Sequence, residues 1–259
     1  MKFVASISAM LTIVGAASAT PVVECFAFDT FDASQRLLSF SQTPAPGAFS
    51  SPGDGFEVYQ RNVSANIPFA LLDDTITFPT DSIGMVKSTK LDRWFGVTDL
   101  ANDDNSSGQG TATWVFDISS YEDLSISIDM AAMGDFEATG LTDLNNWSYS
   151  IDGGALQALF TSSIDENASQ TYTMESGAQF TLDDPMLVNG VTLSNDFQTL
   201  IAAVLGTGST LTLQFFSQGD GGTEAYAFDN IQVCGVLVPA PGAAALFGLA
   251  GLAGLRRRR

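Results

Sequence analysis

The side chains of this chain that could do chemistry are almost all carboxylates. The sequence holds 29 Asp and Glu residues against 10 Lys and Arg, and it contains no histidine. Without histidine, Ser-His-Asp triads, Cys-His pairs and the usual zinc and copper sites are excluded. No Walker or Rossmann glycine pattern lies between a strand and a helix. The chemistry that remains is that of oxygen ligands for hard cations and of paired carboxylates.

Paired carboxylates are the machinery of glycoside hydrolases, but with 29 acids close pairs are unavoidable. The sequence singles out no catalytic pair, so we predict no catalytic residue and no enzyme. A glycan hydrolase is the least favoured function. Glycan binding would need exposed aromatic rings, and the candidates for such a platform are Trp94, Trp147, Tyr59, Tyr149 and Tyr172. The alternative for these five side chains is a place in the core.

Alternating patterns and turn residues dominate the chain, whereas long helical periodicity is hard to find. The clearest strands are expected at residues 111–117, 123–130 and 210–216. A hairpin turn is expected at Asp152-Gly153-Gly154, because glycine permits a positive φ. Residues 165–177 are expected to form a polar connection, and residues 197–205 fit either a strand or a short helix. Further strands are expected at residues 22–28, 56–61, 67–72, 93–97, 147–151, 155–160, 180–182, 187–193 and 225–236.

About a dozen short strands with few helices favour an all-β fold, a two-sheet antiparallel β-sandwich of jelly-roll type. The last strand contains a change of parity. Tyr226 and Phe228 occupy even positions, whereas Ile231 and Val233 occupy odd ones. A one-residue bulge at Asp229-Asn230 would let both apolar pairs face the core. The alternative is a strand that is buried on both faces.

The N-terminus has the three parts of a secretory signal peptide, here residues 1–19. Lys2 is the basic region, residues 3–15 are apolar, and Ala17-Ser18-Ala19 is a small-residue cleavage site. Cleavage is expected between Ala19 and Thr20. The chain between this signal and the C-terminal tail, residues 20–237, is expected to form the β-sandwich domain.

The C-terminal tail, residues 238–259, combines a proline pair, an apolar run and a basic end. The run of 14 uncharged residues at 242–255 would form a helix of about 21 Å, which is short for a bilayer core of about 30 Å. The closing arginines should stay cytoplasmic. These are Arg256, Arg257, Arg258 and Arg259. The segment therefore predicts a short transmembrane helix, with a plain anchor as the simplest alternative.

The tail resembles the PEP-CTERM sorting signal of bacteria that make exopolysaccharide. The sorting motif is expected at Val238-Pro239-Ala240-Pro241, where Ala240 stands in the place that the family usually gives to Glu. The resemblance implies a membrane hold, followed by processing by an exosortase-type enzyme and display in an extracellular polysaccharide layer. A short apolar run suits a transient hold better than a permanent span.

Without the two terminal signals the chain has five basic residues against 29 acids, a net charge of −24. A phosphate backbone would be repelled, so no nucleic-acid partner is expected. Cys25 and Cys234 lie near the two ends of the mature domain. Because an even pair usually bonds outside the cell, we predict a disulfide between the first and last strands. Two buried free thiols are the alternative.

Residues 114–132, 147–160 and 225–233 resemble bacterial extracellular jelly-roll modules, which include carbohydrate-binding modules. The resemblance implies a structural calcium ion between the start of the domain and its last strand. The implied ligands are Asp29, Asp32 and Asp229, with Asp135 and Glu137 as further candidates. The alternative is that these are solvated acids of an acidic protein.

The function expected from the sequence is that of an exported, non-enzymatic protein of the bacterial surface or exopolysaccharide matrix. Its jelly-roll domain would be structural or adhesive, with calcium as a stabiliser. The alternative is a carbohydrate-binding module with a defined glycan site.

Overall fold

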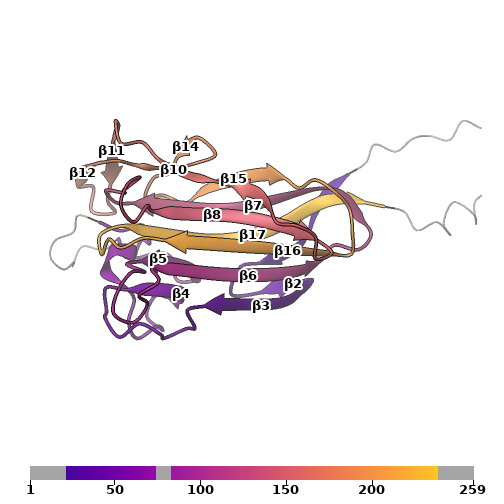
Figure 1. Ribbon diagram of the computed structural model, residues 1–259, viewed down its shortest axis with the longest axis horizontal. Helices are drawn as coiled ribbons and strands as arrows, with labels where there is room; N and C mark the ends of the chain where they lie inside the picture. Colours follow the sequence, from indigo (N-terminus) through magenta and orange to yellow (C-terminus); the bar gives the residue numbers. More distant parts are fainter. Residues whose placement is uncertain (1–21, 74–82, 239–259) are drawn as a thin grey trace, which may run out of the picture.

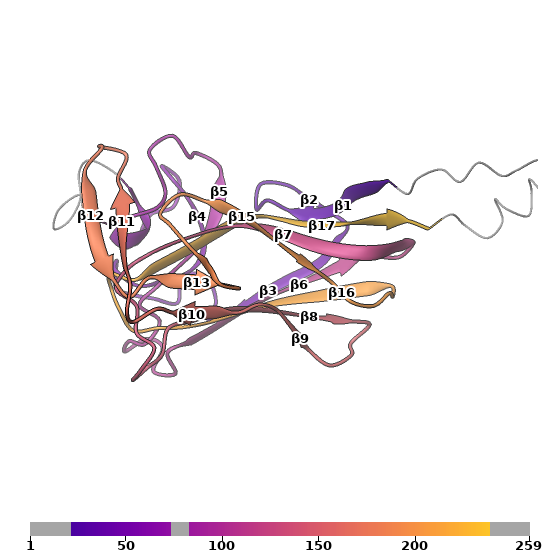
Figure 2. The same ribbon diagram turned by 90° about the horizontal axis from the view of Figure 1, so that it is seen from above.

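The computed structural model describes residues 22–73 and 83–238, and these form a β-sandwich. Two large antiparallel sheets lie face to face, and they appear as two layers in Figure 2. Figure 1 looks onto the smaller of the two sheets. The expected all-β, antiparallel fold is therefore confirmed.

The larger sheet has seven strands and follows the order β15-β7-β17-β1-β2, with β5 beside β17 and β4 beside β5. Its central strands are β7 and β17, each of which is 13 residues long. The strands are β1 (Val23–Asp29), β2 (Ser34–Gln35), β4 (Gly55–Gln60), β5 (Arg93–Thr98), β7 (Tyr121–Met133), β15 (Gln198–Ala203) and β17 (Ala225–Leu237).

The second large sheet has five strands in the order β3-β6-β16-β8-β9. They are β3 (Leu37–Thr43), β6 (Gln109–Asp117), β8 (Leu144–Ile151), β9 (Gln157–Phe160) and β16 (Thr210–Gln218). Strands β6 and β16 alternate strictly between buried and partly exposed residues from Gly110 to Asp117 and from Thr210 to Gln218. This alternation is typical of a sheet with one face on the core and one in water.

Two smaller sheets and one short helix complete the described chain. They are β10 (Ser162–Ile164), β13 (Met186–Val188) and β14 (Val191–Thr192) in one sheet, β11 (Ser169–Thr173) and β12 (Gln179–Asp183) in the other, and the 3-10 helix η1 (Phe69–Leu71).

The main core fills the space between the two large sheets and is rich in stacked aromatic rings. Trp147 and Phe228 contact each other, and both contact Trp114 and Phe215, with ring centroids 4.7–5.9 Å apart. A second cluster covers the opposite face of the larger sheet, where η1 and the β11–β12 hairpin pack around Trp94 and Tyr172. Both faces of that sheet are therefore covered at this end.

The first and last strands are joined as the cysteines predict. Cys25 and Cys234 form a disulfide, and they are opposite each other in the β1–β17 register. The bulge alternative for the last strand is also confirmed. The register of β17 against β7 shifts between Asp229 and Gln232, and Asn230 has a φ of 53°. As a result Tyr226, Phe228, Ile231 and Val233 all lie in the main core.

Three expectations on local structure are wrong. Residues 67–72 contain the helix η1 and no strand, because Pro68 fixes φ at the helix start and Leu71 N donates to Pro68 O. Residues 165–177 contain the strand β11 as well as loop. The expected strand at 187–193 is divided into β13 and β14 by a turn at Asn189-Gly190, both with positive φ. Residues 197–205 form the strand β15 and no helix.

The signal peptide with Ala19 and Thr20, and the tail beyond Val238, lie outside the described residues. Within residues 22–73 and 83–238, no helix is long and apolar enough to cross a membrane.

Candidate functional site

The outer face of the five-stranded sheet carries hydroxyl and amide groups and almost no charge. In the middle of this face, one row runs across the strands through Ser41, Thr113, Gln214 and Ser148. Neighbouring strands lie about 4.8 Å apart, so the side chains of such a row are adjacent. We call this surface the uncharged face, and it comprises Ser39, Ser41, Thr43, Thr111, Thr113, Val115, Asn146, Ser148, Thr212, Gln214 and Phe216.

The polar groups in the middle of the uncharged face are free for a ligand. In the described part of the chain, the side chains of Thr113, Gln214 and Ser148 make no hydrogen bond to another protein group. Phe216 lies in the next row, paired with Thr111 and Asn146, and its side chain is partly exposed. The face therefore combines hydrogen-bonding groups with one aromatic ring. The only acid in β6 is Asp117, which is the last residue of the strand and lies at the end of this face.

The aromatic residues that the sequence offers as a glycan platform are all in the cores. Trp94, Trp147, Tyr59, Tyr149 and Tyr172 are each at most 2% exposed. Trp147 Nε1 donates to Tyr226 Oη, and Tyr149 Oη accepts from Leu205 N. A place in the core is therefore confirmed for all five side chains, and none of them forms an exposed platform. Trp147 and Tyr149 pack in the main core between the two large sheets, whereas Trp94, Tyr59 and Tyr172 pack in the second cluster on the opposite face of the larger sheet.

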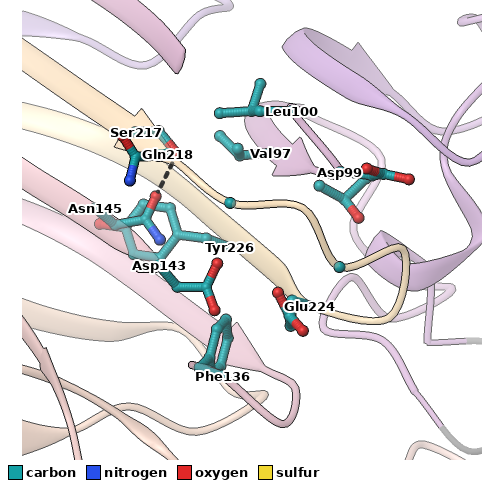
Figure 3. Close-up of a pocket in the computed structure, with 13 residues that line it drawn as sticks. Val97, Asp99, Leu100, Phe136, Asp143, Asn145, Ser217, Gln218, Glu224 and Tyr226 are labelled. Atoms are coloured by element: carbon teal, nitrogen blue, oxygen red, sulfur yellow. Dashed lines mark hydrogen bonds between the residues drawn. The ribbon is translucent and has the colours of Figure 1, made fainter. Parts of the chain in front are cut away.

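A second candidate site lies at one end of the sandwich, where two connections meet. The β7–β8 connection supplies Glu137 and Asp143, and the β16–β17 connection supplies Asp220 and Glu224. Each of these four carboxylates offers an oxygen atom that lies within 4.8 Å of the others. We call them the acidic cluster. Figure 3 shows Asp143 and Glu224 with their carboxylates directed toward each other.

Local backbone contacts hold the acidic cluster in place. Glu137 N donates to Asp143 Oδ2 at 2.7 Å, and Asp143 N donates to Glu137 O at 2.9 Å, which closes the β7–β8 connection. In the β16–β17 connection, a side chain at Gly221 would come within 2.0 Å of the Glu224 carboxylate. Only glycine fits there while Glu224 keeps its position.

Burial and mutual repulsion raise the pKa values of two members of the acidic cluster. Burial raises the pKa of Asp143 to about 7. Burial raises the pKa of Glu224 to about 9, and the charges of Asp143 and Glu137 add to that rise. Glu224 Oε2 is buried without a hydrogen-bond partner in the described structure. Such a group takes up a proton or a cation at neutral pH.

The hollow beside the acidic cluster is small. It has a volume of about 20 Å³, and Asp99, Asp143, Glu224 and Tyr226 are among the residues that line it. This is enough for one water molecule or one ion, but a sugar ring does not fit. The carboxylates at this end can therefore hold a proton or a cation, whereas a sugar cannot reach them through this hollow.

The structure does not bring the predicted calcium ligands together. Asp29 lies on the core face, where it accepts from Trp114 Nε1 at 3.0 Å. Asp229 lies on the opposite face of the same sheet, beside Asp129, and Lys90 Nζ is 2.6 Å from its Oδ2. Burial raises the pKa of Asp229 to about 6, and the Lys90 ammonium opposes that rise.

The remaining predicted ligands are also separated from one another. Asp32 is exposed and accepts from Arg93 N at 2.8 Å. Asp135 is also exposed. Its pKa is raised by partial loss of hydration and by the nearby charge of Asp184. Of the predicted ligands, Glu137 alone belongs to the acidic cluster.

Sequence reasoning missed the other three members, Asp143, Asp220 and Glu224. Each is an acid next to a strand end, which is a weak signal in a chain with 29 acids. It also missed the uncharged face, although the Thr-x-Thr patterns of β6 and β16 are visible in the sequence. Those patterns place Thr111 with Thr113, and Thr210 with Thr212, on the side opposite the apolar residues.

Comparison with protein-family models found no match, and comparison with curated proteins found none either. Among solved structures, the chain is similar to carbohydrate-binding modules. One is a family 22 xylan-binding domain from Paenibacillus barcinonensis, with 8% identity, a TM-score of 0.33, and coverage of 86% of this chain and 100% of that one. Another is a family 11 module from Clostridium thermocellum in complex with a β-1,3-1,4-mixed-linked tetrasaccharide, with 12% identity, a TM-score of 0.33, and coverage of 82% and 97%.

A third similar structure comprises a family 22 module and a xylanase module from Clostridium thermocellum, complexed with xylohexaose. It has 9% identity and a TM-score of 0.33, and the match covers 82% of this chain but 28% of that one. Similarity at this level does not identify a ligand for this chain.

Proposed function

We propose that this chain is an exported, non-catalytic, polysaccharide-binding β-sandwich of the cell surface or extracellular matrix, and that its uncharged face binds the glycan. The disulfide between Cys25 and Cys234 supports export, since such bonds persist in oxidising compartments. Binding of a glycan, the alternative among the expectations from the sequence, has more support than a purely structural role.

The observation that carries this proposal is the row of unpaired hydroxyl and amide groups next to Phe216. A sugar offers hydroxyl groups that donate and accept, and Thr113, Gln214 and Ser148 can do both. A sugar also has an apolar side that packs on an aromatic ring. A sheet face with both kinds of group matches an extended polysaccharide chain.

The charge of the molecule limits the kind of glycan. The body carries five basic residues against 29 acids, so polysaccharides with carboxylate or sulfate groups would be repelled at long range. The uncharged face is where a neutral chain can approach without burying a carboxylate. The proposed ligand is therefore a neutral polysaccharide.

A binding panel tests this proposal. The protein is titrated by calorimetry with soluble xylan, mixed-linkage β-glucan and dextran as neutral chains, and with alginate and polygalacturonate as anionic chains. We expect binding to at least one neutral chain, and no binding to the anionic chains at low salt. Binding to none of the neutral chains, or preference for an anionic chain, would refute the proposal.

We propose a second, supporting role for the acidic cluster, which is to hold a calcium ion. Four convergent carboxylates suit a hard cation that takes six to eight oxygen ligands. A bound ion would neutralise Glu224 and Asp143 and tie the β7–β8 and β16–β17 connections together. The calcium site that we propose is therefore at this end of the sandwich, and not near the chain termini, where the resemblance placed it. An unchanged melting temperature after addition of calcium at pH 8 would contradict this role.

We further propose that the tail holds the protein at the membrane before an exosortase-type enzyme processes it. The order of its parts, from Pro239 to Arg259, supports this step. The described chain ends at Val238, whose N–H donates to Ser120 O at the edge of the fold. Val238 therefore lies at the end of the sandwich opposite the acidic cluster.

A further inference from the structure

Strand β15 is an unprotected edge of the larger sheet. It pairs with β7 over six consecutive residue pairs, from Gln198–Met130 to Ala203–Ser125, and it is the last strand on that side. In the described structure its other edge has no strand partner. Ile201 on this strand is 70% exposed, and Leu205 just after it is 71% exposed.

Other edge strands of the two large sheets carry protective features that β15 lacks. Strand β3 has a bulge and is followed by Pro44, β9 has four residues and a bulge, β2 has two residues, and β4 carries Glu57. Bulges, prolines, charges and short length all prevent pairing between molecules. Strand β15 has a regular register, and residues 197–210 contain no charged residue and no proline.

There is also space next to β15. A hollow of about 420 Å³ lies along Gln198–Ile201, and Phe160, Asn189 and Val191 line its other side. Residues 198–201 of β15 therefore border a hollow and are not packed against another strand on this side.

We infer that β15 pairs in antiparallel fashion with β15 of a second copy of this chain, which makes a two-fold dimer with a continuous larger sheet. A second copy is the fitting occupant because its own β15 offers the same regular, unpaired and uncharged edge. The net charge of −24 on each body opposes association at long range, so two copies can meet closely only where the contact buries no further charge, as along residues 197–210. In a two-fold interface the same segment meets itself, so an uncharged segment meets an uncharged one. The exposed Ile201 side chains would lie on the same face of the joined sheet and pack together.

The geometry has a consequence for polysaccharide binding. Antiparallel pairing of two identical edges keeps the same face of the sheet on the same side, because the two-fold axis is perpendicular to the sheet. Both five-stranded sheets then lie on one side of the dimer, and both uncharged faces point in one direction. A dimer would thus hold one polysaccharide chain at two places, which raises the effective affinity. The dimer itself does not depend on the proposed function.

Sedimentation velocity of the full chain without polysaccharide tests this inference. The wild type is compared with Ile201→Glu, which places two like charges across the pair, and with Val63→Glu as a matched control, since Val63 is 68% exposed and lies outside β15. We expect dimers for the wild type and for Val63→Glu. For Ile201→Glu the dissociation constant should rise at least about tenfold.

Hydrogen exchange provides an independent readout. Amide protons of residues 198–203 should exchange more slowly as the wild-type concentration rises, but not in Ile201→Glu. A second variant, Ala203→Glu, should act in the same way if Ile201→Glu fails to fold. A wild type that stays monomeric at about 100 μM would overturn the inference, as would a dimer that both β15 variants leave intact.

Discussion

Phe216 is an aromatic ring on the side of β16 that otherwise carries Thr and Gln side chains. Its neighbour Phe215 faces the core, so the two rings lie on opposite sides of the sheet. We predict that Phe216→Ala weakens binding of a neutral polysaccharide about tenfold, since a stacked ring contributes about 1–2 kcal/mol. Calorimetry with the chain that binds best measures this change.

The control for Phe216→Ala is Phe180→Ala, which removes a partly buried ring that packs in the second core cluster. This control should lower stability and leave the affinity unchanged. If the two variants bind equally well, Phe216 does not contact the glycan. Gln214→Ala and Gln179→Ala form a second matched pair, because Gln214 lies on the uncharged face and Gln179 lies on β12.

The acidic cluster makes stability depend on pH. In the unfolded chain the carboxyl pKa values are about 4, whereas Asp143 and Glu224 have raised values of about 7 and about 9 in the fold. The folded protein therefore binds more protons between these limits, so stability falls as the pH rises from about 5 to about 9. We predict that the melting temperature drops by about 5 °C or more over this range when a chelator is present.

Calcium and one substitution separate the contributions to this pH dependence. Added calcium should restore much of the lost stability at pH 8.5, and Glu224→Gln should make the protein less dependent on both pH and calcium. Glu166→Gln, at an exposed position, serves as the control. A melting temperature that rises with pH would contradict the raised pKa values.

At the scale of strands, alternation of apolar and polar residues was sufficient to predict the strands that have one face on the core. Strands β6, β7 and β16 could be predicted because their apolar residues recur at every second position. For β17 the sequence indicates the bulge only as one of two alternatives, since Tyr226 and Ile231 differ in parity, and the structure shows that both are buried.

Strands with few buried residues could not be found in this way. In β11 only Tyr172 is buried, and in β3 every residue is exposed or only partly buried. The apolar signal of β11 is Tyr172 alone. Strand β3 contains Leu37, Leu38 and Phe40, but Leu38 and Phe40 are exposed, so its apolar residues do not mark a buried face. Strand β3 forms because it pairs with β6, which is far from it in sequence, and no local pattern shows that pairing.

The acidic cluster was beyond sequence reasoning for a related reason. Glu137 and Asp143 meet Asp220 and Glu224 because β8 lies beside β16, and β17 lies beside β7. This strand order depends on how the whole sandwich packs. The sequence suggests Glu137 as a calcium ligand, but it places the main ligands near the first and last strands and does not indicate Asp143, Asp220 or Glu224.

The disulfide cross-links two neighbouring strands of the larger sheet. It joins β1 to β17 across a sequence separation of 209 residues. A cross-link over so long a loop removes much entropy from the unfolded chain, so we predict that Cys25→Ser with Cys234→Ser lowers the free energy of unfolding by about 2–5 kcal/mol. Urea unfolding measures this loss. Reduced wild type should match the double variant, and equal stability of oxidised and reduced wild type would contradict the prediction.

At the scale of the whole molecule, charge and termini fit one another. The body has a net charge of −24, which favours solubility. The C-terminal tail ends in four arginines and so has the opposite charge. We predict that mature protein from the native host lacks Arg256, Arg257, Arg258 and Arg259, as well as residues 1–19. Mass spectrometry of the intact protein measures both ends. Mature protein that still carries the four arginines would identify the tail as a plain anchor.

The uncharged face is the centre of the functional account, and a nuclear magnetic resonance titration tests it most directly. Labelled protein is titrated with an oligosaccharide of the neutral polysaccharide that it binds best, and the amide shifts are followed. We predict that saturable shifts concentrate at outward residues of β6, β16 and β8, with Thr113, Gln214 and Phe216 among the largest. Shifts that concentrate at the acidic cluster or at β15, or no saturable shifts with that oligosaccharide, would contradict the account.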